Sequence, residues 1–124
     1  MIEYEKLNAD FISERFPELA AQAADETADR TEFLPHVVFG NLFNRLTVSL
    51  LKRGETENPL LHRIFDMYEE LACGDEETQN LVQVTLLEYL WDEKSTYARA
   101  EKLLGERTKQ LWKNIAEYLD IPLK

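Results

Sequence analysis

The most apolar part of the chain is residues 78–91, with the sequence TQNLVQVTLLEYLW. On a helix that advances by about 100° per residue, its apolar side chains point in almost every direction. A helix of this kind in a globular protein is a central one with other helices packed around it, and this one is too short and too polar to span a membrane. We therefore expect a central helix here. Its only charged strip is expected to hold Glu77, Leu81, Thr85, Glu88 and Asp92.

Apolar residues at helical spacing recur along the rest of the chain, and prolines and glycines separate the segments. The predicted helices cover residues 4–16, 18–30, 35–53, 59–73, 95–104 and a last segment from 111 to 121. Asn58 is expected to cap the helix that begins at Pro59, and Asp75 and Ser95 are expected to cap the two helices that follow. Gly40 costs its helix about 1 kcal/mol relative to alanine, so we expect it to mark a close helix contact or an irregular first turn.

No alternation typical of β-strands extends over a useful length, which predicts an all-α fold. We expect six or seven helices in a single domain over residues 1–124. The connections are short, so consecutive helices should be antiparallel neighbours. Such antiparallel hairpins form either a HEAT-like short stack of helix pairs or a compact helical bundle, and the stack is the preferred arrangement.

The net charge of −10 is concentrated in residues 55–93, where eleven acids meet one base. This balance repels phosphate backbones, so we expect no nucleic-acid partner. It attracts a basic protein and speeds the encounter, although acids on a small helical protein also serve solubility alone. The residues expected to form a partner-binding acidic ridge are Asp66, Glu69, Glu70, Asp75, Glu76, Glu77, Glu88 and Asp92.

The chain lacks the motifs of common catalytic and metal sites, since it has no P-loop, no H-E-x-x-H and no pair of cysteines. We therefore expect no catalytic residues, no metal ion and no cofactor. His62 and Asp66 lie one helical turn apart and are interpreted as a weak ion pair, while His36 at a helix start is expected to serve packing or capping. The single Cys73 can form no internal disulfide, and with the absence of a signal peptide this predicts a reducing cytoplasm.

Asn80 and Gln83 form an amide pair one helical turn apart, on the side of the central helix away from its charged strip. If this side is buried, both amides need hydrogen-bond partners. The preferred interpretation is a polar lock between neighbouring helices. The alternative is a pocket beside Asn80, Gln83 and His62, which would make the chain a small-molecule-binding or enzymatic domain.

Two segments, LPHVVFGNLFNRLTVSLL and LLHRIFDMYEELACGDEETQNLVQVTLLEYLWD, resemble a family of small, uncharacterised bacterial all-helical proteins. The resemblance covers roughly residues 33–120 and is most specific at QNLVQVTLLEYL. The family has no assigned activity, so it implies no catalytic residues. In size and charge the chain is also similar to small acidic immunity proteins, which bind and block a cognate toxin.

These patterns together predict a cytoplasmic protein–protein interaction module rather than an enzyme. Its most concrete form is an immunity-type protein that binds and neutralises a basic toxin through the acidic ridge. We expect no membrane partner. A structural homodimer, built through the basic faces of the third or the last helix, is a further alternative.

Overall fold

The computed structural model describes residues 1–28, 32–91 and 94–119. All regular elements within these residues are helical, which confirms the predicted all-α class. The first elements in chain order are η1 (Tyr4–Lys6), α1 (Ala9–Arg15), η2 (Pro17–Leu19), α2 (Ala20–Thr27), α3 (Pro35–Phe39), η3 (Gly40–Asn44) and α4 (Arg45–Lys52). The remaining ones are α5 (Pro59–Ala72), α6 (Glu76–Asn80), η4 (Leu81–Leu87), η5 (Glu88–Trp91), α7 (Lys94–Glu101) and α8 (Glu106–Leu119). Of the short elements, η1, η2 and η5 are 3₁₀ helices, whereas η3 and η4 are π-helices.

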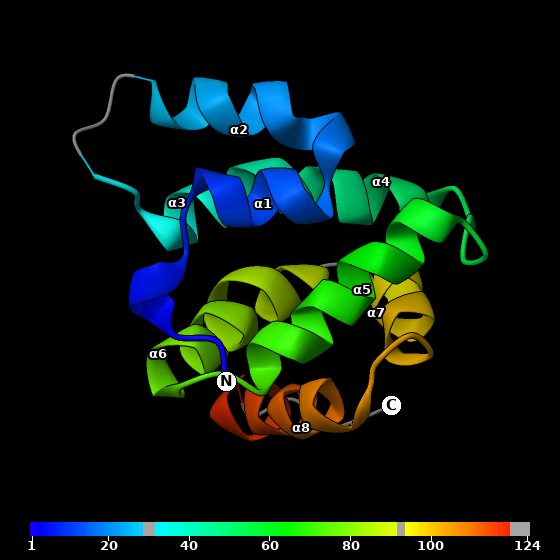
Figure 1. The fold of residues 1–124 in the computed structure, drawn as a ribbon. Helices are drawn as coiled ribbons and strands as arrows, with labels where there is room; N and C mark the ends of the chain where they lie inside the picture. Colours follow the sequence, from blue (N-terminus) through cyan, green and yellow to red (C-terminus); the bar gives the residue numbers. More distant parts are fainter. Residues whose placement is uncertain (29–31, 92–93, 120–124) are drawn as a thin grey trace.

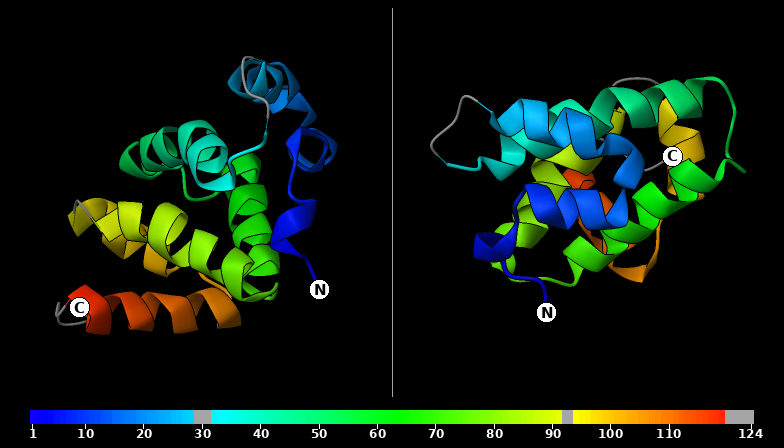
Figure 2. Two further views of the ribbon diagram at one scale, coloured as in Figure 1. Left: turned by 90° about the vertical axis from the view of Figure 1, so that its left-hand side faces the viewer. Right: turned by 45° about the horizontal axis from the view of Figure 1, so that its top comes forward.

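The long helices lie in successive layers (Figures 1 and 2). The continuous run α3–η3–α4 forms one layer, the run α6–η4–η5 forms the next, and α8 forms the last. The left view of Figure 2 shows α5 crossing beside these layers. Because η4 contacts α3 and η3 on one side and α8 on the other, the helix that was predicted to be central is the middle layer.

The middle layer carries a large share of the hydrophobic core. Its completely buried apolar side chains are Leu81, Val82, Leu86, Leu87 and Leu90. Burial of each such side chain contributes about 1.5–3 kcal/mol. Val84 and Tyr89 on the same run are each 39% exposed. The helix is therefore central, but one of its faces remains open, which the sequence pattern did not predict.

The charged strip expected along this helix is wrong at two positions. Leu81 is completely buried, and Thr85 is half-buried in contact with α3. The prediction used the α-helical angle per residue, whereas η4 is a π-helix, whose i→i+5 hydrogen bonds place more residues in each turn. The side chains therefore rotate away from their α-helical positions. Asp92, also assigned to the strip, lies outside the described residues.

Gly40 lies at the start of η3, where this layer meets η4. A Cβ atom at Gly40 would lie 3.3 Å from Cγ2 of Thr85, and the side-chain amide of Asn44 donates to the carbonyl oxygen of Thr85 at 3.1 Å. The expectation of a close helix contact at Gly40 is confirmed. The irregular turn also exists, but it begins at Gly40 rather than in the first turn of the helix.

Two of the three predicted helix caps are present. Asn58 accepts a hydrogen bond from the backbone N–H of Leu60 at 2.9 Å, and Asp75 accepts one from that of Thr78 at 3.0 Å. Each satisfies an N–H group that the first turn of a helix leaves unpaired. Ser95 is not a cap, because α7 begins one residue earlier and leaves Ser95 inside the first turn.

Asp75 also fixes the N-terminal segment of the chain. Its carboxylate accepts hydrogen bonds from the N–H of Tyr4 at 3.1 and 3.2 Å, and its own N–H donates to the carbonyl of Ile2 at 3.0 Å. The hydroxyl of Thr78, followed by the N–H of Tyr4, lowers the pKa of Asp75. Gly74 permits the approach, since a Cβ there would lie 2.6 Å from the Ile2 carbonyl oxygen. This contact places Tyr4 beside α6.

Glu69 joins α5 to α8. Its carboxylate accepts hydrogen bonds from the N–H groups of Arg107 and Thr108, each at 2.9 Å, and from the hydroxyl of Thr108. Burial alone would raise the pKa of Glu69, but the hydrogen bonds from Thr108 and Arg107 outweigh burial and lower the pKa. Gly105 leaves room for the carboxylate, because a Cβ there would lie 2.5 Å from Glu69 Oε1. Glu69 is therefore a cap for a helix that begins far along the chain.

Replacement of Glu69 by alanine should lower the free energy of unfolding by about 1–2 kcal/mol, the usual effect of losing a helix cap. Asp66→Ala, an exposed position one turn earlier on α5, is the control and should change it little. Because the pKa of Glu69 is lowered in the folded chain, its contribution exists above the pKa of the unfolded chain and disappears as the pH falls through the folded pKa. Chemical denaturation should therefore show the difference between wild type and Glu69→Ala shrinking in acid. A difference independent of pH would contradict the role of the charged carboxylate.

Replacement of Gly74 by alanine should destabilise the fold by about 1–3 kcal/mol, because the added Cβ would overlap the backbone of Ile2. The N-terminal segment should also become more sensitive to proteolysis. Gly40→Ala is the comparison variant and should cost less stability, since there the nearest atom is the Thr85 side-chain methyl group at 3.3 Å rather than backbone and alanine favours a helix. Equal loss of stability in the two variants would show that the contact with Ile2 has no special weight.

Candidate functional site

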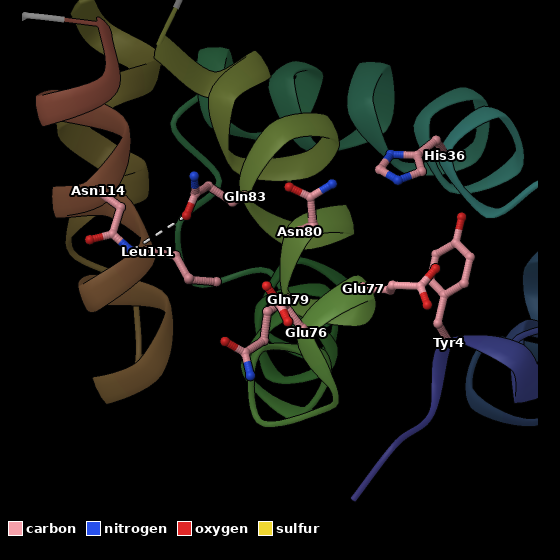
Figure 3. Close-up of a pocket in the computed structure, with 9 residues that line it drawn as sticks. All are labelled: Tyr4, His36, Glu76, Glu77, Gln79, Asn80, Gln83, Leu111 and Asn114. Carbon is pink, nitrogen blue, oxygen red and sulfur yellow. Dashed lines mark hydrogen bonds between the residues drawn. The ribbon is translucent and has the colours of Figure 1, made fainter.

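An open pocket of about 440 Å³ lies on the middle layer. Figure 3 shows α6 and η4 as its floor, α8 as one wall, and α3 with the N-terminal segment as the other. The lining residues are Tyr4, His36, Glu76, Glu77, Gln79, Asn80, Gln83, Leu111 and Asn114. Most of these side chains are polar, so the pocket offers hydrogen bonds more than apolar contact.

A second open pocket, of about 550 Å³, lies between α3–η3 and η4 and shares His36 with the first. Its other lining residues are Val37, Gly40, Asn41, Asn44, Arg45, Thr85 and Tyr89. The hydrogen bond between His36 and Thr85 lies where the two pockets meet, so a ligand that enters both pockets must pass over it. We refer to the two pockets together as the groove. The middle layer is thus the floor of the groove along most of its length.

The floor of the groove changes in chemistry from one end to the other. The exposed residues of the run α6–η4–η5 are, in chain order, Glu76, Glu77, Asn80, Val84 and Tyr89, and all of them except Val84 line the groove. The exposed residues from Asn80 onward follow each other at intervals of four and five, which fits the wider turns of the π-helix. The order along the floor is therefore acid, amide and then apolar, with the exposed Arg45 beside Tyr89.

His36 ties the wall of the groove to its floor. Its Nδ1 atom shares a short hydrogen bond with the hydroxyl of Thr85. The ring of Tyr4 lies 6.1 Å from that of His36 between centroids, and Figure 3 shows the phenol pointing toward the imidazole. Burial, and next the negative charge of Glu77, raise the pKa of Tyr4. The phenol therefore remains protonated at neutral pH and can donate a hydrogen bond into the pocket.

The amide pair predicted from the sequence lines this groove. Asn80 is exposed and Gln83 is half-buried, so neither amide is enclosed between helices. Gln83 Oε1 accepts a hydrogen bond from Nδ2 of Asn114 on α8 at 3.5 Å, which is at the weak limit of such bonds. The polar lock is thus present only as this long contact, and Asn80 has no hydrogen bond to any described residue.

His62 does not belong to this pocket. Its Nε2 atom is hydrogen-bonded to the carbonyl oxygen of Thr56 at 2.7 Å, at the start of α5. The histidine in the groove is His36, which sequence reasoning assigned to packing or capping. Both histidines follow a proline near a helix start, so local sequence gave no signal to choose between them. The packing of α3 against η4 makes the difference.

The residues assigned to the acidic ridge occupy several different surroundings. Glu69 and Asp75 cap helices, as described above, and Glu70 accepts a hydrogen bond from Nε of Arg15 at 3.1 Å. Asp66 lines a small surface pocket with Arg15 and Arg63, and Glu88 is half-buried. Of the ridge residues that the structure describes, only Glu76 and Glu77 line the groove, and neither forms an ion pair with any other described residue.

The described part of the chain contains no cluster of three or more His, Cys, Asp or Glu side chains that could hold a metal ion. Cys73 is exposed and forms no disulfide. None of the described helices is long and apolar enough to cross a membrane. The groove offers hydrogen-bonding, charged and exposed apolar side chains.

Comparison with known proteins supports the expected membership of an uncharacterised family. The family model for "Domain of unknown function (DUF7674)" matches residues 9–119. Neither the curated proteins nor the solved structures give a significant match. The matched region contains every residue of the groove except Tyr4. The chain therefore belongs to the DUF7674 family, a family of unknown function.

Proposed function

We propose that the chain is a protein-interaction module that binds a basic partner at the acidic end of the groove. The observation that carries this proposal is the position of Glu76 and Glu77. Both are exposed, both line the groove, and neither is paired with a base among the described residues. By contrast, Glu18, Glu55 and Glu70 pair with arginines of the same chain.

The wider charge distribution supports the same function. Residues 55–93, which include α5 and the floor of the groove, carry eleven acids and one base. A field of this sign attracts basic proteins and raises their rate of encounter, and the effect falls with ionic strength. Glu76 and Glu77 give the attracted partner a defined place to bind.

Exposed apolar side chains supply the contact area that a purely solvated acidic surface lacks. Val37 and Tyr89 line the groove and are 38% and 39% exposed. Val84, on the same helical run as Tyr89 but outside the lining of the groove, is 39% exposed. Protein interfaces combine such apolar anchors with a polar rim. In the groove, Val37 and Tyr89 lie near amide and charged side chains.

The most concrete version of this function is an immunity-type protein that resides in the cytoplasm and neutralises a basic cognate toxin. The size of the chain and its net charge of −10 support this version. The toxin would approach the groove through its own basic surface. Binding there would cover the part of the toxin that recognises its target.

A second candidate function is the binding of a small polar molecule in the pocket that contains Asn80 and Gln83. Its volume of about 440 Å³ falls within the usual range of small-molecule sites, about 300–1,000 Å³. Such sites are mostly lined by apolar side chains, whereas Leu111 is the single aliphatic residue in this lining. The polar and open lining therefore favours a protein partner.

Reversal of the two acids in the groove should weaken binding of the partner at least about tenfold, or about 1.4 kcal/mol. The measurement is calorimetric titration of the full chain, with Glu76→Lys and Glu77→Lys combined, against the product of the gene adjacent to it in its genome. The control combines Asp10→Lys and Glu14→Lys, two exposed positions on α1 that change the net charge equally. Circular dichroism verifies that both variants fold.

Equal weakening in the test and control variants would mean that net charge alone acts, which would contradict a binding site at the groove. The absence of binding by the wild-type chain would contradict the function with this partner. Binding of the wild type should also weaken with added salt, because exposed charges are screened. Light scattering of the free chain separates binding of a partner from self-association.

A further inference from the structure

We infer that the groove binds an extended segment of the partner protein, which carries a basic side chain near one end and an apolar and an acidic side chain near the other. This inference rests on the proposed function and specifies the part of the partner that enters the site. The basic side chain pairs with Glu76 and Glu77, the main chain follows Asn80 and Gln83, and the acidic side chain pairs with Arg45.

The amides on the floor match the main chain of an extended segment. A primary amide offers N–H donors and a carbonyl acceptor, the same complementary groups that a peptide unit presents. A segment outside helices and sheets has both of its main-chain groups unpaired and available. Asn80 has no hydrogen bond within the described chain, and Gln83 has only its 3.5 Å contact with Asn114. Both amides can therefore replace hydrogen bonds to water with hydrogen bonds to a peptide, without the loss of a strong hydrogen bond within the chain.

The charges at the two ends give the segment a direction. Glu76 and Glu77 lie at the beginning of the floor, and Arg45 lies in the second pocket beside Tyr89. Arg45 is exposed and forms no ion pair with a described residue. A segment with its base and acid in the opposite order would bring like charges together at both ends, which disfavours the reversed orientation.

The apolar part of the groove lies next to Arg45. Val37 from the wall and Tyr89 from the floor both expose more than a third of their surface there. Tyrosine combines a large apolar ring with a hydroxyl that can stay hydrated, which suits it as an anchor at an interface. An apolar side chain of the bound segment therefore precedes or follows the acidic one, at the end away from Glu76.

The length of the groove sets the length of the segment. From Glu77 to Tyr89 the floor spans at most about 18 Å, at 1.5 Å per helical residue. An extended chain advances by about 3.3 Å per residue, so about six residues cover this distance. A single short loop or tail of the partner is therefore enough to occupy the groove.

The test is selection of short random peptides, displayed on phage, against the full chain. The enriched peptides should share a Lys or Arg separated by a few residues from an apolar residue with an adjoining Asp or Glu. A synthetic peptide of the enriched sequence should bind Asn80→Ala and Arg45→Glu about tenfold more weakly than the wild type in fluorescence anisotropy. Gln22→Ala on α2 and Lys109→Glu on α8, both exposed and outside the groove, are the matched controls and should bind normally.

A charge exchange tests the assigned pairing directly. A peptide in which Lys replaces the acidic residue should bind Arg45→Glu better than it binds the wild type. No enrichment, enrichment without this order of charges, or the lack of rescue by the exchanged peptide would overturn the inference. Calorimetry with the folded partner tests the proposed function separately. Failure of the peptide experiments can therefore be distinguished from failure of the proposed function.

Discussion

The arrangement of the helices depends on the contact between the layer α3–η3–α4 and η4, and three interactions of that contact meet at Thr85. Its hydroxyl is hydrogen-bonded to His36, its carbonyl oxygen accepts from the amide of Asn44, and its methyl group faces Gly40. Both helices have π-helical turns at this place. The bond from the Asn44 side chain to the Thr85 carbonyl oxygen joins the two helices within their widened segments.

The widened turns let one helix serve both as core and as the floor of a groove. The leucines of η4 and η5 face inward and are completely buried. The side chains of Asn80, Val84 and Tyr89, at intervals of four and five residues, remain on the open face instead. A regular α-helix of the same sequence would place Val84 and Tyr89 well apart around its circumference. The open face of this run therefore depends on its widened turns as well as on its sequence.

The sequence alone predicts the helical class, the central helix and two of the caps, because periodicity and capping are local properties. It predicts neither the π-turns nor the open face. Both occur where Asn44 and Gly40 meet Thr85, which lies about forty residues further along the chain, and such long-range packing is not a local property. The expectation of His62 beside Asn80 and Gln83 is wrong because it, too, depends on the packing of distant helices. His36 and His62 both lie in the first turn of a helix that begins with proline, and the packing of the two helices decides which one enters the groove.

The roles of the acidic residues likewise depend on contacts with distant parts of the chain. These contacts show which acidic residues remain available to a partner. Charge counting treats Glu69, Asp75 and Glu76 alike, yet the first two hold backbone N–H groups that lie 39 and 71 residues away in the chain. Their charges serve the fold, and removal of either would leave N–H groups without a partner. Glu76 forms no such hydrogen bond with a described residue, and it lines the groove. The excess of acid in residues 55–93 thus overstates the charge available to a partner, and the part that remains available lies where the amides and the exposed apolar side chains begin.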